Sequence, residues 1–111
     1  SVGIAATAQV VTDQNLMGKV LVTGLGLPSE MIDYVKNGAS TKFAIWNPVD
    51  LGYFNAYVSH HVAQGNLTGK KGEKFSAGRM GDYTVEVDGE VTFGNIFRFD
   101  ASNIDEGAKL F

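Results

Sequence analysis

The fold of this chain is decided by residues 19–64, KVLVTGLGLPSEMIDYVKNGASTKFAIWNPVDLGYFNAYVSHHVAQ. Two short apolar runs, 19–23 and 42–46, predict buried β-strands. A helix is expected after each of them, over residues 28–36 and 48–64. A strand–helix–strand–helix order requires parallel pairing through right-handed crossovers, so the predicted fold class is α/β with a parallel sheet.

The two predicted helices have clear boundaries and one apolar face each. Asn47 is a good N-cap for the second helix, and Pro48 suits its first position, where a missing N–H costs nothing. The first helix should stop at Asn37-Gly38. The residues expected to face inward recur at helical spacing: Met31, Ile32 and Val35 in the first helix, and Leu51, Phe54, Val58 and Val62 in the second.

Before this stretch, residues 4–16 are Ala-rich and predict an amphipathic helix. The apolar positions of that helix lie near one side: Ile4, Ala8, Val11 and Leu16. After Gly65 the chain becomes Gly- and Lys-rich and irregular, with a possible strand at 74–77.

A β-hairpin is predicted near the C-terminal end. Residues 83–87 and 90–93 alternate between apolar and polar side chains around Asp88-Gly89, and this dipeptide is the strongest short hairpin signal. Residues 97–99 predict a last short strand, and residues 101–111 a loosely ordered tail.

Composition excludes several classes of function. The chain has 111 residues, 44% of them hydrophobic, and a formal net charge of −3. An acidic balance argues against nucleic acid or an anionic membrane as the main partner, because both require a basic face. No apolar run approaches the roughly 20 residues that cross a bilayer, and the chain as given carries no export signal. With no Cys, disulfides and thiolate chemistry are excluded.

The predicted sheet would be incomplete by itself. Two parallel strands leave two bare edges and an uncovered face, whereas parallel sheets occur mainly when both faces are buried. We therefore expect the chain to be a piece of a larger α/β protein. We also expect its exposed sheet to be buried against another copy, which makes a homo-oligomer of the piece a possible assembly.

No catalytic set, metal site or cofactor is predicted. Gly24-Leu25-Gly26 lies between a strand and a helix, but Pro28 interrupts the dinucleotide-binding pattern, which favours an ordinary turn. His60 and His61 are adjacent on a helix and point about 100° apart, so they cannot chelate one metal ion. His61 is expected to border the buried face and His60 to be solvated.

Trp46 is the strongest candidate for a ligand contact. It is the only Trp, and it ends a predicted strand directly before the capping Asn47. Ligands of open parallel sheets bind beyond the carboxyl ends of the strands, where an indole packs on a sugar face and its N–H donates a hydrogen bond. The alternative, a Trp46 that fills a core between sheet and helix, is equally compatible with its position.

The segment GLGLPSEMIDYVKNGASTKFAIWNPVDLGYFNAYV resembles the C-terminal part of type I periplasmic sugar-binding proteins, which are receptors of ABC importers. The similarity is strongest to the rhamnose and autoinducer-2 binding branch, and IWNPVDLGY is its most specific part. The opening SVGIAATAQ, the Asp-Gly hairpin and FRFDASNID also resemble that branch, so the resemblance covers essentially the whole chain.

This resemblance implies two Rossmann-like lobes that close on a sugar around a hinge. Residues 1–46 would then belong to the C-terminal lobe, and residues 47–65 to a hinge crossing and a helix of the N-terminal lobe. Residues 66–111 would form a loop, the hairpin and a C-terminal tail. The whole protein would be a non-enzymatic receptor, periplasmic or anchored outside the membrane, with an ABC permease as its partner.

The resemblance also implies where the ligand binds. Galactose and ribose binders often carry an Asp at the position of Gly26 and an amide at the position of Trp46. The cleft here would be less polar, which favours rhamnose, another deoxysugar or autoinducer-2. Asn47 is Asp in some autoinducer binders, so these ligands stay unresolved. Trp46 and Asn47 are the expected ligand residues, and Ser1 borders the cleft.

Two other functions remain open. A sugar-sensing domain of a transcriptional repressor shares this fold and would have a DNA-binding helix-turn-helix upstream. A small α/β enzyme is the alternative from a different class, although no catalytic set can be assembled from the sequence. Because the polar groups of a two-lobed receptor come from both lobes, this chain alone is expected to bind sugar negligibly.

Overall fold

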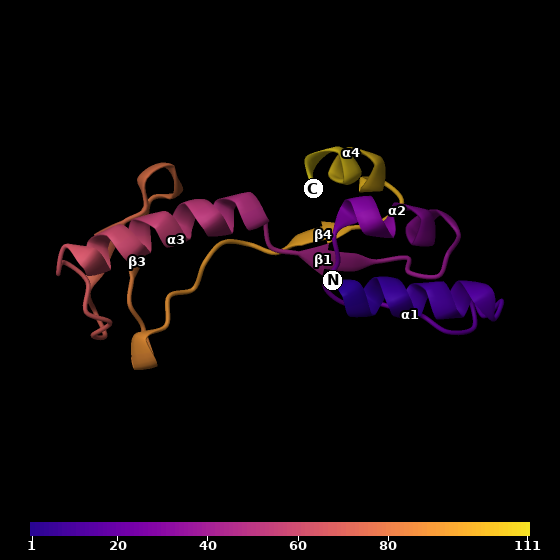
Figure 1. The fold of residues 1–111 in the computed structure, drawn as a ribbon, viewed down its shortest axis with the longest axis horizontal. Coiled ribbons are helices and arrows are strands. Elements are labelled where there is room, and N and C mark those ends of the chain that lie inside the picture. Colours follow the sequence, from indigo (N-terminus) through magenta and orange to yellow (C-terminus); the bar gives the residue numbers. More distant parts are fainter. The chain divides into compact units, whose positions relative to one another are not determined.

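A computed structural model describes residues 1–111, and it divides into two compact units (Figure 1). Unit 1 comprises Ser1–Ile45 and Ile96–Phe111, and unit 2 comprises Trp46–Asn95. The chain passes between the units twice, after Ile45 and after Asn95. None of the helices combines the length and the apolar character that a membrane span requires.

Unit 1 has a two-stranded ladder with helices packed around it. Strands β1 (Phe43–Ile45) and β4 (Phe97–Phe99) pair antiparallel, with Ile45 opposite Phe97. Figure 1 shows helix α1 (Val2–Asp13) on one side of this ladder and helices α2 (Pro28–Lys36) and α4 (Ile104–Leu110) on the other. The predicted helix over 28–36 is confirmed at both ends, and the last strand at 97–99 is confirmed too.

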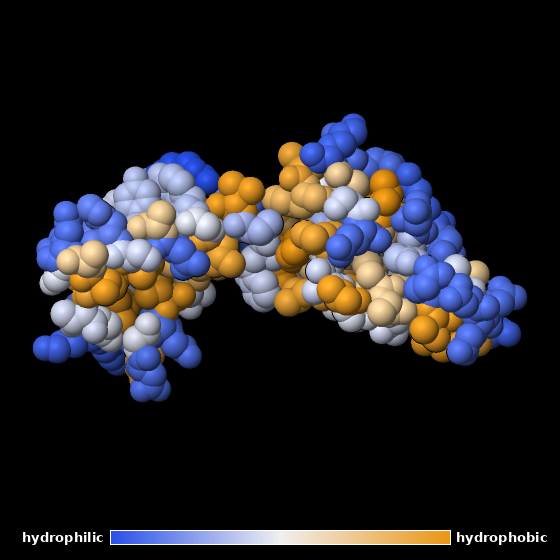
Figure 2. All heavy atoms as spheres, viewed as in Figure 1, coloured by the Kyte–Doolittle hydropathy of each residue, from blue (hydrophilic) through white to orange (hydrophobic).

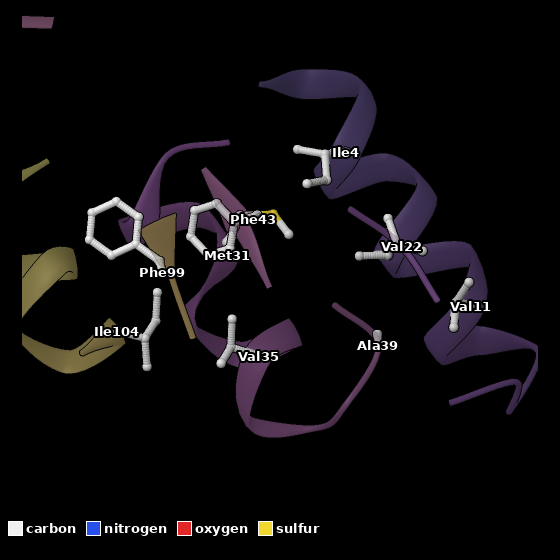
Figure 3. Close-up of a cluster of buried hydrophobic side chains, with 10 residues drawn as sticks. Ile4, Val11, Val22, Met31, Val35, Ala39, Phe43, Phe99 and Ile104 are labelled. Atoms are coloured by element: carbon white, nitrogen blue, oxygen red, sulfur yellow. The ribbon is translucent and has the colours of Figure 1, made fainter. Parts of the chain in front are cut away.

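The core of unit 1 joins side chains from all of these elements (Figure 3). Met31 of α2 is fully buried, and the rings of Phe43 and Phe99 stack with centroids 5.4 Å apart across the β1–β4 ladder. The inward face predicted for the helix over residues 4–16 is largely confirmed in α1, because three of its four expected positions are buried: Ile4, Ala8 and Val11.

The strand predicted at 19–23 is not formed. Within this segment, Val22 and Thr23 donate hydrogen bonds to the carbonyls of Ala39 and Lys42, which precede β1. The pairing with β1 itself is an isolated parallel bridge between Leu25, just after the segment, and Ala44. The bridge consists of the Ala44 N–H donating to the Gly24 carbonyl and the Gly26 N–H donating to the Ala44 carbonyl. A strand exists only through its ladder, and the outer side of residues 19–23 has no partner here. The parallel direction was therefore predicted correctly, whereas the regular strand was not.

The tail predicted to be loosely ordered is instead helical. Within residues 101–111, α4 packs against α2, and Ile104 is only 1% exposed. Gly107 lies against the ring of Phe99, so closely that a Cβ there would be 2.4 Å from a ring carbon. A seven-residue helix shows too little periodicity to be recognised from sequence, and tertiary packing stabilises it.

Unit 2 is built from helix α3 and a short hairpin. Helix α3 (Pro48–Ala63) begins where the sequence predicts and ends one residue before the predicted end. Strands β2 (Lys74–Ser76) and β3 (Asp82–Thr84) pair antiparallel, joined through the 3₁₀ turn η1 (Gly78–Met80). The small core between helix and hairpin is aromatic and aliphatic: Phe54, Leu67, Phe75, Ala77 and Val85.

The hairpin therefore pairs different residues from those predicted. Asp88-Gly89 does form a turn, the 3₁₀ segment η2 (Val87–Gly89), in which both residues have positive φ, 61° and 79°. The Glu86 N–H donates to the Glu90 carbonyl across this turn, but residues 90–93 form no strand. The strand over 82–84 is already paired with β2, and this longer-range pairing was not visible from the dipeptide signal.

The buried face of α3 is also narrower than predicted. Phe54 is 5% exposed, but Leu51 and Val62 are 42% and 54% exposed. The residues that turn toward the hairpin include Tyr57 and Val58. A two-stranded hairpin covers only a thin strip of a sixteen-residue helix, so part of the apolar face stays at the surface.

Hydrophobic residues reach the surface of both units (Figure 2). The most exposed large side chains in unit 1 are those of Val2, Leu21 and Leu110, and in unit 2 those of Val49, Val62 and Val87. The expectation that a second copy of the chain covers the open sheet edge stays a prediction.

Candidate ligand-binding residues

Trp46 directly follows β1 and precedes α3. Its side chain is not enclosed within a core, because the residue is 41% exposed. The bridge between Leu25 and Ala44 shows that the segment before Gly26 runs parallel to β1. Trp46 therefore follows the carboxyl end of one of two parallel segments, the end at which α/β proteins bind ligands.

Asn47 caps α3 through its side-chain oxygen. Asn47 Oδ1 accepts hydrogen bonds from the N–H groups of Val49 at 2.9 Å and Asp50 at 3.2 Å. The Asn47 carbonyl accepts from the Leu51 N–H. The Nδ2 group of the same side chain donates to no protein atom in the structure. Asn47 can therefore hold the helix start with one end of its amide and offer a donor to a ligand with the other.

Ser1 lies in unit 1 at the N-cap of α1, and its hydroxyl makes no capping hydrogen bond. It lines an open groove of about 640 Å³ together with residues of α1 and of the extended segment 20–25. The groove wall is largely apolar, with Leu21 73% exposed. Two hydroxyls there are already engaged, because Thr7 donates to the Gly3 carbonyl and Thr23 to the Lys42 carbonyl.

Gly26 has no room for a side chain. A Cβ at this position would lie 2.9 Å from Met31 Cγ and 3.0 Å from Ile4 Cγ2. Both distances are closer than packed carbon atoms normally approach. Any side chain at this position would have to displace Met31 and Ile4 in the core of unit 1.

The two histidines lie as predicted. His60 is exposed and His61 is partly buried, with the ring of His61 facing Phe75. His61 Nε2 lies 2.9 Å from the Ser76 carbonyl oxygen, and a carbonyl only accepts, so Nε2 carries the proton. His61 thus ties α3 to β2.

A polar cluster on unit 2 was missed by the sequence analysis. The N–H of Arg79 donates to the hydroxyl of Tyr53 at 3.0 Å, and its guanidinium lies 4.3 Å from the centroid of the Tyr53 ring. The same guanidinium forms an ion pair with Asp50. Asp50 and Arg79 are 29 positions apart, and no motif links them. A turn bounded by Gly78 and Gly81 was the only local signal.

The hydrogen bonds of this cluster shift its ionisation. The Tyr57 hydroxyl, and then the Arg79 N–H, hold the pKa of Tyr53 below its ordinary value. The same hydrogen bond to Tyr53 raises the pKa of Tyr57. The hydrogen bond to Asp50 raises the pKa of Arg79, which keeps the guanidinium charged.

The loop after α3 is organised around one carboxylate. Glu73 accepts from the Thr68 hydroxyl and from the N–H groups of Thr68, Gly69 and Lys70. These bonds, the Thr68 hydroxyl first, hold the pKa of Glu73 below its ordinary value. The lysine-rich loop is therefore folded around its own anion, and the three N–H groups are not open to a ligand.

Known proteins resemble this chain in sequence and in fold. Residues 1–67 match the family model described as periplasmic binding protein domain. No curated protein sequence matches the chain. A sugar ABC transporter structure from Actinomyces odontolyticus is 46% identical, with a TM-score of 0.73, over 95% of this chain and 34% of that chain.

Two further solved structures are similar. An ABC transporter solute-binding protein from Clostridium phytofermentas with bound L-rhamnose is 40% identical, with a TM-score of 0.89, over 99% of this chain and 38% of that chain. LsrB from Clostridium saccharobutylicum in complex with AI-2 is 23% identical, with a TM-score of 0.78, over 93% of this chain and 36% of that chain, and supports the fold alone.

The chain thus spans little more than a third of the length of these relatives. Its α/β fold, with α1, α2 and β1 inside the matched residues, is that of part of a periplasmic-binding-protein fold, as predicted. The matched region also includes Trp46 and Asn47. The chain therefore belongs to the periplasmic binding protein domain family.

Proposed function

We propose that this chain is part of the solute-binding receptor of an ABC importer for a sugar or sugar-like ligand. One observation carries the proposal. Trp46 presents a partly exposed indole and Asn47 an unpaired amide donor at the end of β1, in a chain 40% identical to a rhamnose-bound relative over 99% of its length. The receptor binds its solute without chemical conversion.

The ligand we propose is rhamnose or another deoxysugar, with autoinducer-2 as the second candidate. The face of the Trp46 indole suits the apolar side of a sugar ring, and Asn47 Nδ2 suits a hydroxyl acceptor. Gly26 leaves no space for a carboxylate, so this position supplies no polar side chain to a ligand. A ligand with a methyl group in place of a hydroxyl fits this part of the cleft better than glucose or ribose.

Ser1 is proposed as a residue at the border of the cleft. Its hydroxyl makes no capping hydrogen bond to α1, and the residue lines the groove of unit 1. We assign residues 1–46 to the C-terminal lobe, the α3 region 47–65 to the N-terminal lobe and residues 66–111 to the loop, the hairpin and the tail. The 96–111 part of that tail packs within unit 1.

Binding occurs by closure of two lobes around the connections between them. Ile45 and Phe97 face each other in the β1–β4 ladder, and the chain leaves unit 1 just after the first and re-enters it just before the second. Two adjacent connections allow bending about one line, as a hinge requires. The whole receptor would work in the periplasm or anchored at the outer surface, and would deliver its solute to an ABC permease.

The test is calorimetry on a hybrid receptor. Residues 1–111 replace the matched stretch of the rhamnose-bound relative, and L-rhamnose and autoinducer-2 are titrated separately. We expect the hybrid to bind one of them and Trp46→Ala to weaken binding by about 30-fold, the cost of losing a central aromatic contact of about 2 kcal/mol. Val87→Ala, at an exposed apolar position of unit 2, is the matched control and should bind like the parent.

The 111-residue chain alone should give no measurable heat with either ligand, because one part of a two-lobed binding site supplies too few polar contacts. A hybrid that unfolds cooperatively but binds neither ligand refutes the proposal. Equal binding by Trp46→Ala and the parent refutes the role of the indole. Micromolar binding of L-rhamnose by the chain alone contradicts the two-lobe mechanism.

A further inference from the structure

The turn formed by Gly78–Gly81, here named the Arg79 turn, is pressed onto the N-terminal half of α3. Gly78 has a φ of 56°, and a Cβ there would lie 2.3 Å from the Tyr53 hydroxyl oxygen and 2.5 Å from that of Tyr57. Only glycine allows such an approach, and it also tolerates the left-handed backbone. The turn is closed internally by the Ala77 N–H donating to the Gly81 carbonyl at 2.8 Å.

Arg79 contacts two successive turns of α3. Its guanidinium forms an ion pair with Asp50 in the first turn and stacks over the ring of Tyr53 in the next. Its N–H donates to the Tyr53 hydroxyl. One residue therefore makes three contacts of different kind to the start of α3, and a bidentate, planar cation is suited to such a combination.

Hydrogen bonds connect Arg79 to Asn47, one of the proposed ligand residues. Asp50, whose carboxylate pairs with Arg79, donates its N–H to Asn47 Oδ1. Asn47 directly follows Trp46 in sequence, and both belong to unit 2. The path from Arg79 to the amide of Asn47 contains only one intervening residue.

We propose that Arg79 is a positioning residue for the ligand: through Asp50 it fixes the first turn of α3, and so holds Trp46 and Asn47 in their ligand-binding orientation. This inference rests on the proposed function. It adds that ligand affinity depends on a side chain that touches no ligand. Pre-ordering of binding residues increases affinity because less conformational freedom is lost on binding.

The first experiment needs no ligand. Trp46 is the only Trp of the chain, so its fluorescence anisotropy decay and its quenching by acrylamide report on that residue alone. We expect Arg79→Gln to increase the amplitude of nanosecond motion of Trp46 and its quenching. Asp50→Asn should have the same effect, because both substitutions remove the ion pair between Arg79 and Asp50. The double variant should then show no more motion or quenching of Trp46 than either single variant. Lys74→Gln removes a charge at an exposed position of β2 and is the matched control.

Two further variants separate positioning from general stability. Arg79→Lys retains the charge opposite Asp50 and should restore most of the order of Trp46. About 1 M NaCl shortens the Debye length to about 3 Å and should weaken the ion pair between Arg79 and Asp50. Salt should therefore increase the motion of Trp46 in the parent but cause no further increase in Arg79→Gln, which lacks the ion pair. Gly78→Ala should act like Arg79→Gln, since it lifts the turn from the helix. A loss of thermal stability without a change at Trp46 would overturn the proposal.

The second experiment is the hybrid receptor described above. Arg79→Gln should weaken L-rhamnose binding by about two- to tenfold, the range expected for restoring freedom to one or two ordered side chains, and Arg79→Lys should recover it. Unchanged affinity in a hybrid that binds overturns the inference. A parent hybrid that binds neither ligand refutes the proposed function instead, and the Trp46 fluorescence then still decides whether Arg79 positions this residue.

Discussion

Replacing Asn47 should change the stability of the protein with a sign and size set by its helix cap. In Asn47→Ala, the N–H groups of Val49 and Asp50 lose their acceptor, Asn47 Oδ1, at 2.9 and 3.2 Å. The loss of an N-cap acceptor lowers the free energy of unfolding by about 1 kcal/mol, within a range of roughly 0.5–2 kcal/mol. Asn47→Asp keeps a capping oxygen and adds a negative charge at the helix N-terminus, which stabilises by about 0.3–1 kcal/mol.

The assay is urea unfolding of the chain followed by Trp46 fluorescence, because this signal arises at the start of α3. Asn55→Ala is the matched control: it is the same substitution at an exposed position inside the same helix. Alanine has the higher helix propensity, so Asn55→Ala should stabilise by up to about 0.7 kcal/mol, the opposite sign to Asn47→Ala. The reasoning is refuted if both alanine variants shift the midpoint equally, or if Asn47→Asp is as unstable as Asn47→Ala.

Three further predictions concern packing and pH. Ile104→Ala should lower the free energy of unfolding of unit 1 by about 2–5 kcal/mol in chemical denaturation, because Ile104 is only 1% exposed. Leu110→Ala should have little effect, because Leu110 is 71% exposed. Equal effects of the two substitutions would contradict the packing of α4. Gly26→Ala should cost about 1–3 kcal/mol, because its Cβ would meet Met31 Cγ at 2.9 Å, and a melting temperature equal to that of the parent would contradict this. The pKa of Glu73 in the folded protein lies below its ordinary value, chiefly because its carboxylate accepts a hydrogen bond from the Thr68 hydroxyl. Ionised Glu73 therefore stabilises the folded protein fully above the unfolded-state pKa of about 4.3. This contribution to stability is lost as the pH falls through the folded-state pKa. The stability difference between the parent and Glu73→Gln, from denaturant titrations, should therefore be constant from about pH 7 to about pH 5 and shrink in more acidic buffer, and a difference that grows on acidification would refute the assignment.

Elements with local signals were predictable from the sequence. Helix α2 begins at Pro28 and ends before Asn37-Gly38, and α3 begins after Asn47, because caps and prolines act within a few residues. Elements that depend on distant partners were not. The segment 19–23 has strand composition but no ladder, and residues 104–110 have weak helical signals but a partner in α2.

The candidate site divides in the same way. Trp46 and Asn47 could be proposed from the sequence because a strand end, a helix cap and a resemblance to a known motif coincide there, and their contact with a ligand stays a prediction. The Arg79 turn was not, since its contacts with Asp50 and Tyr53 span more than 25 positions and arise only when β2 and β3 pair and place the turn over α3. The need for glycine at position 26 likewise follows from its packing against Met31 and Ile4, which the neighbouring sequence does not reveal.

The most direct test of the account is a crystal structure of the hybrid receptor with L-rhamnose bound. The account predicts a sugar ring against the face of the Trp46 indole, with Asn47 Nδ2 donating to a ring or hydroxyl oxygen at about 2.9 Å and Asn47 Oδ1 still capping α3. A rhamnose molecule held elsewhere in the cleft, with Trp46 and Asn47 in contact only with solvent, would contradict it.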